Sequence, residues 1–288
     1  MENLTIGQII EVLPFISSQH SRNSKEYKTF ETITDYVVKN SNLKEKKNAI
    51  IDLGGEIGTI DFPYQEFGAI NSLDLFGLDE LIIFSYYQIN KNKYKNTFDI
   101  GANIGIHSLV MNLCNWNVTS IEPDPIHIEI LKNNLKINDS NRVNVVEAAV
   151  SNVSGELEFV RVEGNTTSSH LAGSKIPYGK LTKFKVKVIP IKEIMSKADF
   201  IKMDVEGNEK NIILDTEIAD WNNTDMILEI GSEENKISIY QHLNKIGVNA
   251  FSQKTNWKKV EKLEDMPNGY KEGSLFISKD EKMNWQNL

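Results

Sequence analysis

Three carboxylates follow strand-like runs of the sequence, where acids can meet a ligand. Asp204 closes the predicted strand 199–204, and Glu206 lies in the turn after it. Glu229 ends the next predicted strand, 226–230. Because ligands of open α/β sheets bind at the carboxyl ends of the strands, we expect the three side chains to converge there. We predict that Asp204 and Glu206 form the polar floor of the site for the substrate, here called the acceptor. Glu229 would be a third catalytic carboxylate.

His170 is the histidine whose surroundings best fit catalysis. It ends the polar stretch 166–170, which lies between segments 155–160 and 184–189, and their alternating pattern predicts an inserted hairpin. A loop there could fold over an acceptor, and imidazole titrates in the range that suits a base. The simpler alternative is a histidine on a surface loop. Likewise, Glu206 is alternatively an acid that stabilises the N-terminus of the next helix.

Two glycine loops share the pattern Asp-aliphatic-Gly-x-x-Ile-Gly, at 52–58 and at 99–105. Glycines let a backbone turn sharply and approach a ligand, and a following helix presents free N–H groups at its start. Apolar residues at helical spacing follow only the second copy, over 106–113. The first copy runs into Pro63, so we predict that it is a turn after a strand.

The loop at 99–105 lacks the Gly-x-Gly-x-x-Gly pattern that admits the pyrophosphate of a dinucleotide. It suits a nucleoside without phosphate, which points to S-adenosyl-L-methionine. Glu122, after the predicted strand 117–121, could accept hydrogen bonds from both ribose hydroxyls. NAD-binding proteins also use an acid at this place, so Glu122 does not separate the two cofactors.

Alternating strands and helices are needed to position these residues. The pattern from Phe98 onward is typical of an α/β domain with a largely parallel sheet. Asp124 and Pro125 predict a helix start, as an N-cap followed by proline at the first helical position. The predicted strands are 97–101, 117–121, 143–147, 199–204 and 226–230, with weaker ones at 248–252 and 274–278.

Three segments in this order resemble the FkbM family of S-adenosylmethionine-dependent methyltransferases: Phe98–Leu109, Ile121–Pro123 and Ile201–Glu209. The resemblance covers about residues 79–255. It implies a Rossmann-like class I methyltransferase fold, with a mostly parallel seven-stranded sheet, an antiparallel last strand and helices on both faces. It also implies methylation of a hydroxyl, often on a sugar, polysaccharide or secondary metabolite. The methyltransferase domain would then span 91–288, after an N-terminal helical and strand extension, 1–90.

The resemblance also implies a set of residues around S-adenosyl-L-methionine. The glycine loop would line its methionine and ribose, Glu122 would hold the ribose, and the small residues at 148–149 would leave room for adenine. Asp204 would face the methyl-bearing end, and Glu80 the amino group. The full implied set is Glu80, Asp99, Gly101, Asn103, Gly105, His107, Ser108, Glu122, Pro123, Glu147, Ala148, Ala149 and Asp204.

The composition argues against several classes of protein. The 288 residues allow one large domain or a domain with an extension. Lys and Arg number 32 and Asp and Glu 40, and the formal charge of −8 argues against a nucleic-acid partner. A single cysteine, Cys114, excludes a disulfide framework and favours a reducing, cytoplasmic location. Apolar runs fall short of the roughly 20 residues of a membrane span, so no stable membrane insertion is expected.

No metal site is predicted, because Glu229-Ile230-Gly231 departs from the Asp-Asn that metal-dependent relatives of this fold carry after their fifth strand. The alternative is that Asp204, Glu206 and Glu229 bind Mg²⁺ through their oxygens. The Asn/Asp-Pro-Pro-aromatic tetrad of enzymes that methylate base or amide nitrogen is absent from the sequence. This absence argues against a nucleic-acid target. The resemblance implies a small-molecule or glycan hydroxyl acceptor as the partner, and the oligomeric state stays open. Two alternatives are a nicotinamide-dependent oxidoreductase on a Rossmann sheet and a non-catalytic cofactor-binding scaffold.

Overall fold

A computed structural model describes residues 4–41, 43–44, 49–67, 70–176 and 178–285. Within them, eight strands form a central sheet in the order β13-β12-β14-β11-β10-β3-β4-β5. The strands are β3 Asn96–Ile100, β4 Asn117–Glu122, β5 Val143–Glu147, β10 Phe200–Met203, β11 Asp225–Leu228, β12 Asn249–Ser252, β13 Lys258–Lys259 and β14 Leu275–Ser278. All seven predicted strands are present, with bounds that differ by at most two residues.

The sheet is mostly parallel. β5, β4, β3, β10 and β11 run parallel to one another, whereas β14 is antiparallel to both β11 and β12. This inserted antiparallel strand confirms the class I arrangement that the resemblance implies. The sheet has one strand more than the seven that the resemblance implies, because β13 pairs with β12 at the edge of the sheet. It consists of two exposed lysines, which carry no apolar alternation to predict it.

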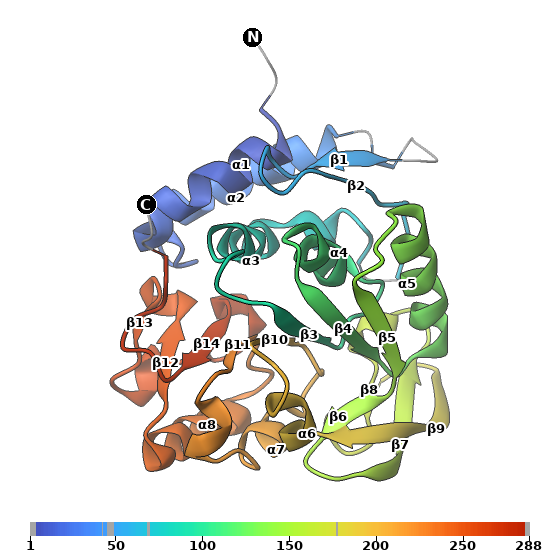
Figure 1. Ribbon diagram of the computed structural model, residues 1–288, viewed down its shortest axis with the longest axis vertical. Coiled ribbons are helices and arrows are strands. Elements are labelled where there is room, and N and C mark those ends of the chain that lie inside the picture. Colours follow the sequence, from blue (N-terminus) through green and yellow to red (C-terminus); the bar gives the residue numbers. More distant parts are fainter. Residues whose placement is uncertain (1–3, 42, 45–48, 68–69, 177, 286–288) are drawn as a thin grey trace.

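Helices cover both faces of the sheet (Figure 1). On one face lie α3 Leu78–Ile89, α4 Ile106–Leu113 and α5 Pro125–Ile137, and their apolar sides pack in one core. On the other face lie α6 Ile191–Met195, α7 Glu209–Ile213 and α8 Glu233–Ile246, which pack in a second core. Helix α4 has the predicted bounds. Helix α5 starts as predicted, since the Asp124 carboxylate accepts a hydrogen bond from the Ile126 N–H at 2.9 Å.

A second sheet is inserted between β5 and α6. Its order is β6-β9-β7-β8, and the strands are β6 Ala149–Ser151, β7 Gly155–Val162, β8 His170–Leu171 and β9 Leu181–Pro190. The antiparallel pair β7-β9 confirms the predicted hairpin. The short strands β6 and β8 were not predicted, because two or three residues are too few to show a period. This sheet lies beside β5, at the edge of the molecule (Figure 1).

The N-terminal residues form a layer over α3 and α4 (Figure 1). It contains α1 Ile6–Val12, the 3-10 helix η1 Leu13–Gln19, α2 Lys25–Lys39 and the hairpin β1 Ile50–Asp52 and β2 Thr59–Asp61. The first glycine loop is the turn of this hairpin, as predicted, and the Leu53 N–H donates to the Gly58 carbonyl across it at 2.9 Å. The remaining 3-10 helices are η2 Asp74–Phe76, η3 Thr166–Ser168, η4 Ile218–Trp221, η5 Gln253–Thr255, η6 Leu263–Asp265 and η7 Tyr270–Glu272.

The N-terminal layer is bonded to the C-terminal part of the sheet. Ser21 Oγ donates to the Lys254 carbonyl at 2.6 Å, and Trp257 Nε1 donates to His20 Nδ1 at 2.9 Å. Burial lowers the pKa of His20 to about 4, so its ring is neutral and can accept this bond. One apolar core also runs from α1 through α3 to α4. The domain boundary at residue 90 stays a prediction.

No helix in the described ranges combines the length and the apolar character that crossing a membrane requires.

Candidate active site

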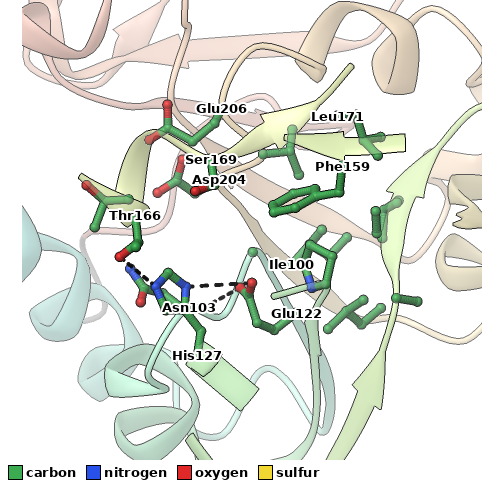
Figure 2. A pocket seen from close by; sticks show the side chains of 18 residues that line it. Ile100, Asn103, Glu122, His127, Phe159, Thr166, Ser169, Leu171, Asp204 and Glu206 are labelled. Atoms are coloured by element: carbon green, nitrogen blue, oxygen red, sulfur yellow. Dashed lines mark hydrogen bonds and ion pairs between the residues drawn. The ribbon is translucent and has the colours of Figure 1, made fainter. Parts of the chain in front are cut away.

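A cavity lies at the carboxyl ends of β3, β4 and β10, where the inserted sheet approaches them (Figure 2). Its empty volume, counting the space open to solvent, is about 590 Å³. Eight of the predicted site residues line it: Gly101, Asn103, Glu122, Pro123, Ala148, Ala149, Asp204 and Glu206. Phe159 and Leu171 of the inserted sheet form part of its wall. The structure therefore brings the second glycine loop, Glu122 at the end of β4, and the carboxylates of Asp204 and Glu206 after β10 to one place.

The glycine loop depends on two close backbone approaches. Gly101 has φ +74°, and a Cβ atom on it would lie 1.7 Å from the carbonyl oxygen of Asp204. Gly105 has φ +90°, and its Cβ would lie 2.2 Å from Leu131 Cδ1. Both positions therefore require glycine. Gly101 lines the cavity, whereas Gly105 does not and instead lets the start of α4 approach the Leu131 side chain of α5.

Glu122 is held by backbone hydrogen bonds at the cavity wall (Figure 2). The Asn103 N–H donates to Oε2 at 2.8 Å, and the Asp124 N–H donates to Oε1 at 2.9 Å. An ionised carboxylate accepts about four hydrogen bonds, so each oxygen can take another. The side chain is buried, and its orientation is set from both sides. Two hydroxyls of a ribose match this arrangement.

His127 is a cavity residue that the sequence reasoning missed. Its Nδ1 lies 3.8 Å from Glu122 Oε1, and its Nε2 lies 2.9 Å from Thr166 Oγ1 (Figure 2). Burial alone would lower the pKa of His127, but the carboxylates of Glu122 and Asp124 outweigh it and raise the pKa. Its position in the first turn of the helix after Glu122 is the signal that could have placed it here.

An ion pair fastens the start of α5 to the inserted sheet. Arg161 Nε and Nη2 donate to the two Asp124 oxygens at 2.7 and 2.6 Å. Burial would raise the pKa of Asp124, but Arg161, His127 and the Ile126 N–H together outweigh this effect and the pKa is lowered. The pair fixes β7 beside the helix that carries His127.

Two predicted cofactor residues lie beneath the glycine loop. Asp99 is fully buried, and its Oδ2 accepts a hydrogen bond from Ser108 Oγ at 2.6 Å. Ser108 Oγ also lies 2.6 Å from Ser120 Oγ. Asp99 Oδ1 is buried and has no hydrogen-bond partner among the described residues. These side chains support the loop from behind.

A second, smaller cavity of about 260 Å³ lies between α3, β10 and β11, and Asp204 lines both cavities. Glu80, Lys202 and Glu229 line the smaller one. Burial raises the pKa of Glu229 well above its usual range, and Asp204 and Glu80 add to the effect, although Lys202 opposes it. The region is rich in carboxyl groups, so it suits a ligand that carries positive charge.

His107 supports this second cavity without lining it. Its Nε2 lies 2.9 Å from Glu80 Oε2, and its Nδ1 lies 2.9 Å from the Tyr87 hydroxyl. Burial would raise the pKa of Glu80, but His107 outweighs it, with help from Lys202, and the pKa is lowered. His107 therefore orients an ionised Glu80.

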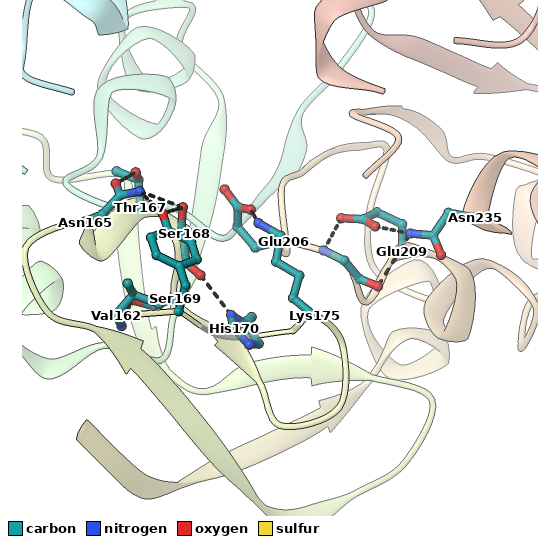
Figure 3. Close-up of polar contacts among 12 residues, drawn as sticks. Val162, Asn165, Thr167, Ser168, Ser169, His170, Lys175, Glu206, Glu209 and Asn235 are labelled. Carbon is teal, nitrogen blue, oxygen red and sulfur yellow. Dashed lines mark hydrogen bonds and ion pairs between the residues drawn. The ribbon is translucent and has the colours of Figure 1, made fainter. Parts of the chain in front are cut away.

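Glu206 and Glu209 lie in the turn after β10 but differ in their surroundings (Figure 3). Both oxygens of Glu209 are in use, since they accept from the Gly207 N–H at 2.8 Å and from Asn235 Nδ2 at 2.6 Å. Glu206 lines the cavity and pairs with Lys175. Burial raises the pKa of each carboxyl to about 7, and Asp204 adds to the effect. Glu209 is thus a structural acid, and Glu206 is the one that faces the cavity.

Two predicted positions need correction. Glu147 was expected beside adenine, but its side chain is exposed and pairs with Lys132 at 2.7 Å. His170 was expected in an open loop, but it lies in β8, where its ring is buried and its Nδ1 lies 2.8 Å from the Ser168 carbonyl. Neighbouring residues of β8 point to opposite faces, and it is Leu171 that reaches the cavity.

In the part of the chain that the structure describes, no three His, Cys, Asp or Glu side chains are grouped so that they could hold a metal ion.

Solved structures that match part of this chain include several methyltransferases. The precorrin-6y C5,15-methyltransferase from Geobacter metallireducens GS-15 matches with a TM-score of 0.34 and 14% identity, over 66% of this chain and 81% of that one. The O-methyltransferase from Bacillus cereus in complex with SAH matches with a TM-score of 0.35 and 9% identity, over 67% and 78%. WbdD matches with a TM-score of 0.38 and 10% identity, over 70% of this chain but only 39% of its own length.

Sequence comparison adds the family. No curated protein matches this chain. Residues 99–266 match the model of the methyltransferase FkbM domain, from the start of the cofactor-type glycine loop to beyond β13. Because the matched residues make up more than half of the 288, the chain belongs to the FkbM methyltransferase domain family.

Proposed function

We propose that this protein transfers a methyl group from S-adenosyl-L-methionine to a hydroxyl of a carbohydrate, polysaccharide or secondary metabolite. The observation that carries the proposal is Glu122, which lines the cavity with both oxygens held by backbone N–H groups. Membership of a methyltransferase family supports the reaction class. The acceptor class rests on the family resemblance and on the carboxylates at the cavity.

The cavity residues fit the parts of S-adenosyl-L-methionine. Glu122 would hold the ribose, and Ala148 and Ala149 would leave room for the flat adenine ring. Asn103 Oδ1, which is buried without a partner among the described residues, is available to a donor of the ligand. Asp204 and Glu80 would face the positively charged methionine end. When bound, S-adenosyl-L-methionine supplies an electrophilic methyl group.

Glu206 is the group that we assign to take the proton of the acceptor hydroxyl. Its pKa of about 7 lets it exist as a carboxylate near neutral pH, and a base of that strength returns the proton readily to water. Glu229 has a pKa well above its usual range, so it would be protonated and would donate a hydrogen bond instead. Asp204, between the two cavities, would help to hold acceptor and cofactor in line, where alignment supplies much of the acceleration.

Cofactor binding is tested first, by calorimetric titration with S-adenosyl-L-methionine. Glu122→Gln should bind about tenfold to a hundredfold more weakly, because a hydrogen bond to a charged group contributes about 1.5–3 kcal/mol. The matched control is Glu147→Gln, which changes an exposed acid paired with Lys132 and should bind as the wild type does. Equal affinity of all three proteins would exclude the assigned ribose site. Stabilisation by NAD and not by S-adenosyl-L-methionine would favour the oxidoreductase.

The acceptor is tested with methyl-labelled S-adenosyl-L-methionine and an extract of the cells that make the protein. We expect label in the carbohydrate or small-metabolite fraction, and loss of that label with Glu206→Gln. Label in protein or nucleic acid would contradict the acceptor class. Binding without transfer to any fraction would favour a non-catalytic scaffold.

The cytoplasmic location stays a prediction from composition, and fractionation of the same cells tests it.

A further inference from the structure

The loop that follows β8, at residues 172–176, reaches the turn that follows β10 (Figure 3). Its Lys175 pairs with Glu206 through Nζ and Oε2, and the two side chains are 34% and 31% exposed. Glu206 lines the main cavity. A lysine of the inserted segment therefore faces the carboxylate that we assign as the proton acceptor.

The same loop also contacts the backbone of this turn. Gly207 has φ +106°, and a Cβ atom on it would lie 2.8 Å from the carbonyl oxygen of Ser174. Glu206 itself has φ +55°, a left-handed conformation that non-glycine residues rarely adopt. Such a conformation persists where surrounding contacts hold it, and it is concentrated at functional sites. The loop thus holds the turn at two points, the backbone of Gly207 and the side chain of Glu206.

Charged groups from three segments face Glu206. Burial has the largest effect on its pKa, and Asp204 at the end of β10 and Glu209 of α7 act in the same direction, toward the neutral acid. Lys175 acts in the opposite direction, toward the carboxylate. Tyr178, near Lys175 in the sequence, also interacts electrostatically with Glu206. The cation that keeps Glu206 able to accept a proton is therefore supplied by the inserted loop.

We propose that Lys175 is a positioning residue that favours the carboxylate form of Glu206 and directs it into the cavity, so that the inserted loop completes the proton-accepting site. The inference rests on the proposed function. In the transfer step, an electron pair of the acceptor oxygen forms the bond to the methyl carbon. The electron pair of the breaking C–S bond stays on sulfur, which becomes a neutral thioether. The hydroxyl proton passes to the Glu206 carboxylate, and Lys175 acts only through that carboxylate.

The direct test titrates Glu206 in the full chain with no ligand added. Glutamate labelled with carbon-13 at the side-chain carboxyl is incorporated, and the Glu206 signal is identified by its loss in Glu206→Gln. Lys175→Met should raise the titration midpoint by about one pH unit or more, because an adjacent opposite charge favours the ionised form. Lys175→Arg should titrate close to the wild type. The matched control is Lys183→Met, since Lys183 of β9 pairs with Glu158 at 2.8 Å.

Equal midpoints in Lys175→Met and Lys183→Met would overturn the inference. If Lys175→Met does not fold, Lys175→Gln carries the same expectation. The acid limb of the pH profile of methyl transfer to the labelled fraction should move upward with the midpoint. Undiminished transfer by Glu206→Gln would overturn the assigned base while leaving the titration result intact, so failure of the function and failure of the inference are distinguishable.

Discussion

The backbone of Gly101 lies directly against the backbone of Asp204. A Cβ atom on Gly101 would be 1.7 Å from the Asp204 carbonyl oxygen, and the Asp204 N–H donates to the Ile100 carbonyl at 2.9 Å. The second glycine loop, after β3, and the segment at Asp204, after β10, are therefore one rigid unit. A shift of either segment moves the other.

Gly101→Ala should destabilise the protein and abolish binding of S-adenosyl-L-methionine. The alanine would be strained by φ +74°, which costs about 1 kcal/mol, and its Cβ would also overlap backbone that cannot move aside. The matched control is Gly164→Ala, where φ is +77° and no atom lies within 4 Å of the added Cβ among the described residues. Thermal unfolding should show a larger loss for Gly101→Ala. Equal losses would contradict the close contact.

His127 should make the stability of the protein depend on pH. Its pKa is raised in the folded state by Glu122 and Asp124, against the effect of burial and of Arg161. The stability that its positive charge contributes is therefore fully present below about pH 6.5, the ordinary value of the unfolded chain, and is lost as the pH rises through the higher folded value. The melting temperature of wild type minus that of His127→Gln should fall over this window.

The control for His127 is His242→Gln, because His242 Nε2 lies 2.9 Å from the backbone carbonyl of Thr216 and the ring forms no ion pair among the described residues. The melting temperature of His242→Gln is measured alongside, as the reference for the loss of a ring that forms no ion pair. A difference between wild type and His127→Gln that does not change with pH would show that the His127 ring does not gain charge beside Glu122.

Local patterns were sufficient to predict most of the sheet and two of the helices that cover it. The apolar spacing at 106–113 marks α4, and Asp124 with Pro125 marks the start of α5, because these signals lie within a short stretch of the chain. Residues whose place depends on distant segments could not be predicted this way. His127 meets Thr166 of η3, which lies between β7 and β8, and His170 is buried by strand pairing with β7. Both outcomes depend on tertiary contacts that no local period reports.

The Arg161–Asp124 pair should contribute strongly to stability. Its two hydrogen bonds are 2.7 and 2.6 Å long, and the side chains are 10% and 0% exposed. Arg161→Met should lower the free energy of unfolding by about 3–5 kcal/mol, because it leaves Asp124 as a buried, unpaired charge. Urea unfolding measures the loss. The exposed pair Lys183–Glu158 provides the control, and Lys183→Met should cost at most about 1 kcal/mol.

The double variant Asp124→Asn, Arg161→Met should lose less stability than the sum of its single variants, since no charge is then left unpaired. Additive losses would contradict a buried, mutually dependent pair.

Glu229 should be protonated in the folded protein near neutral pH. Burial raises its pKa well above the usual range, and Asp204 and Glu80 add to this, although Lys202 opposes it. The contribution of the carboxyl to stability is then fully present below about pH 4.3, the ordinary value of the unfolded chain, and is lost as the pH rises toward the folded value. Glu229→Gln keeps the shape of the side chain but has no group to ionise, so it removes this loss of stability at high pH. Its melting temperature should exceed that of wild type at about pH 8, and the gap should narrow toward about pH 4. A lower melting temperature for Glu229→Gln at about pH 8 would show instead that Glu229 is ionised and paired with Lys202, and it would then be a second candidate for the proton acceptor.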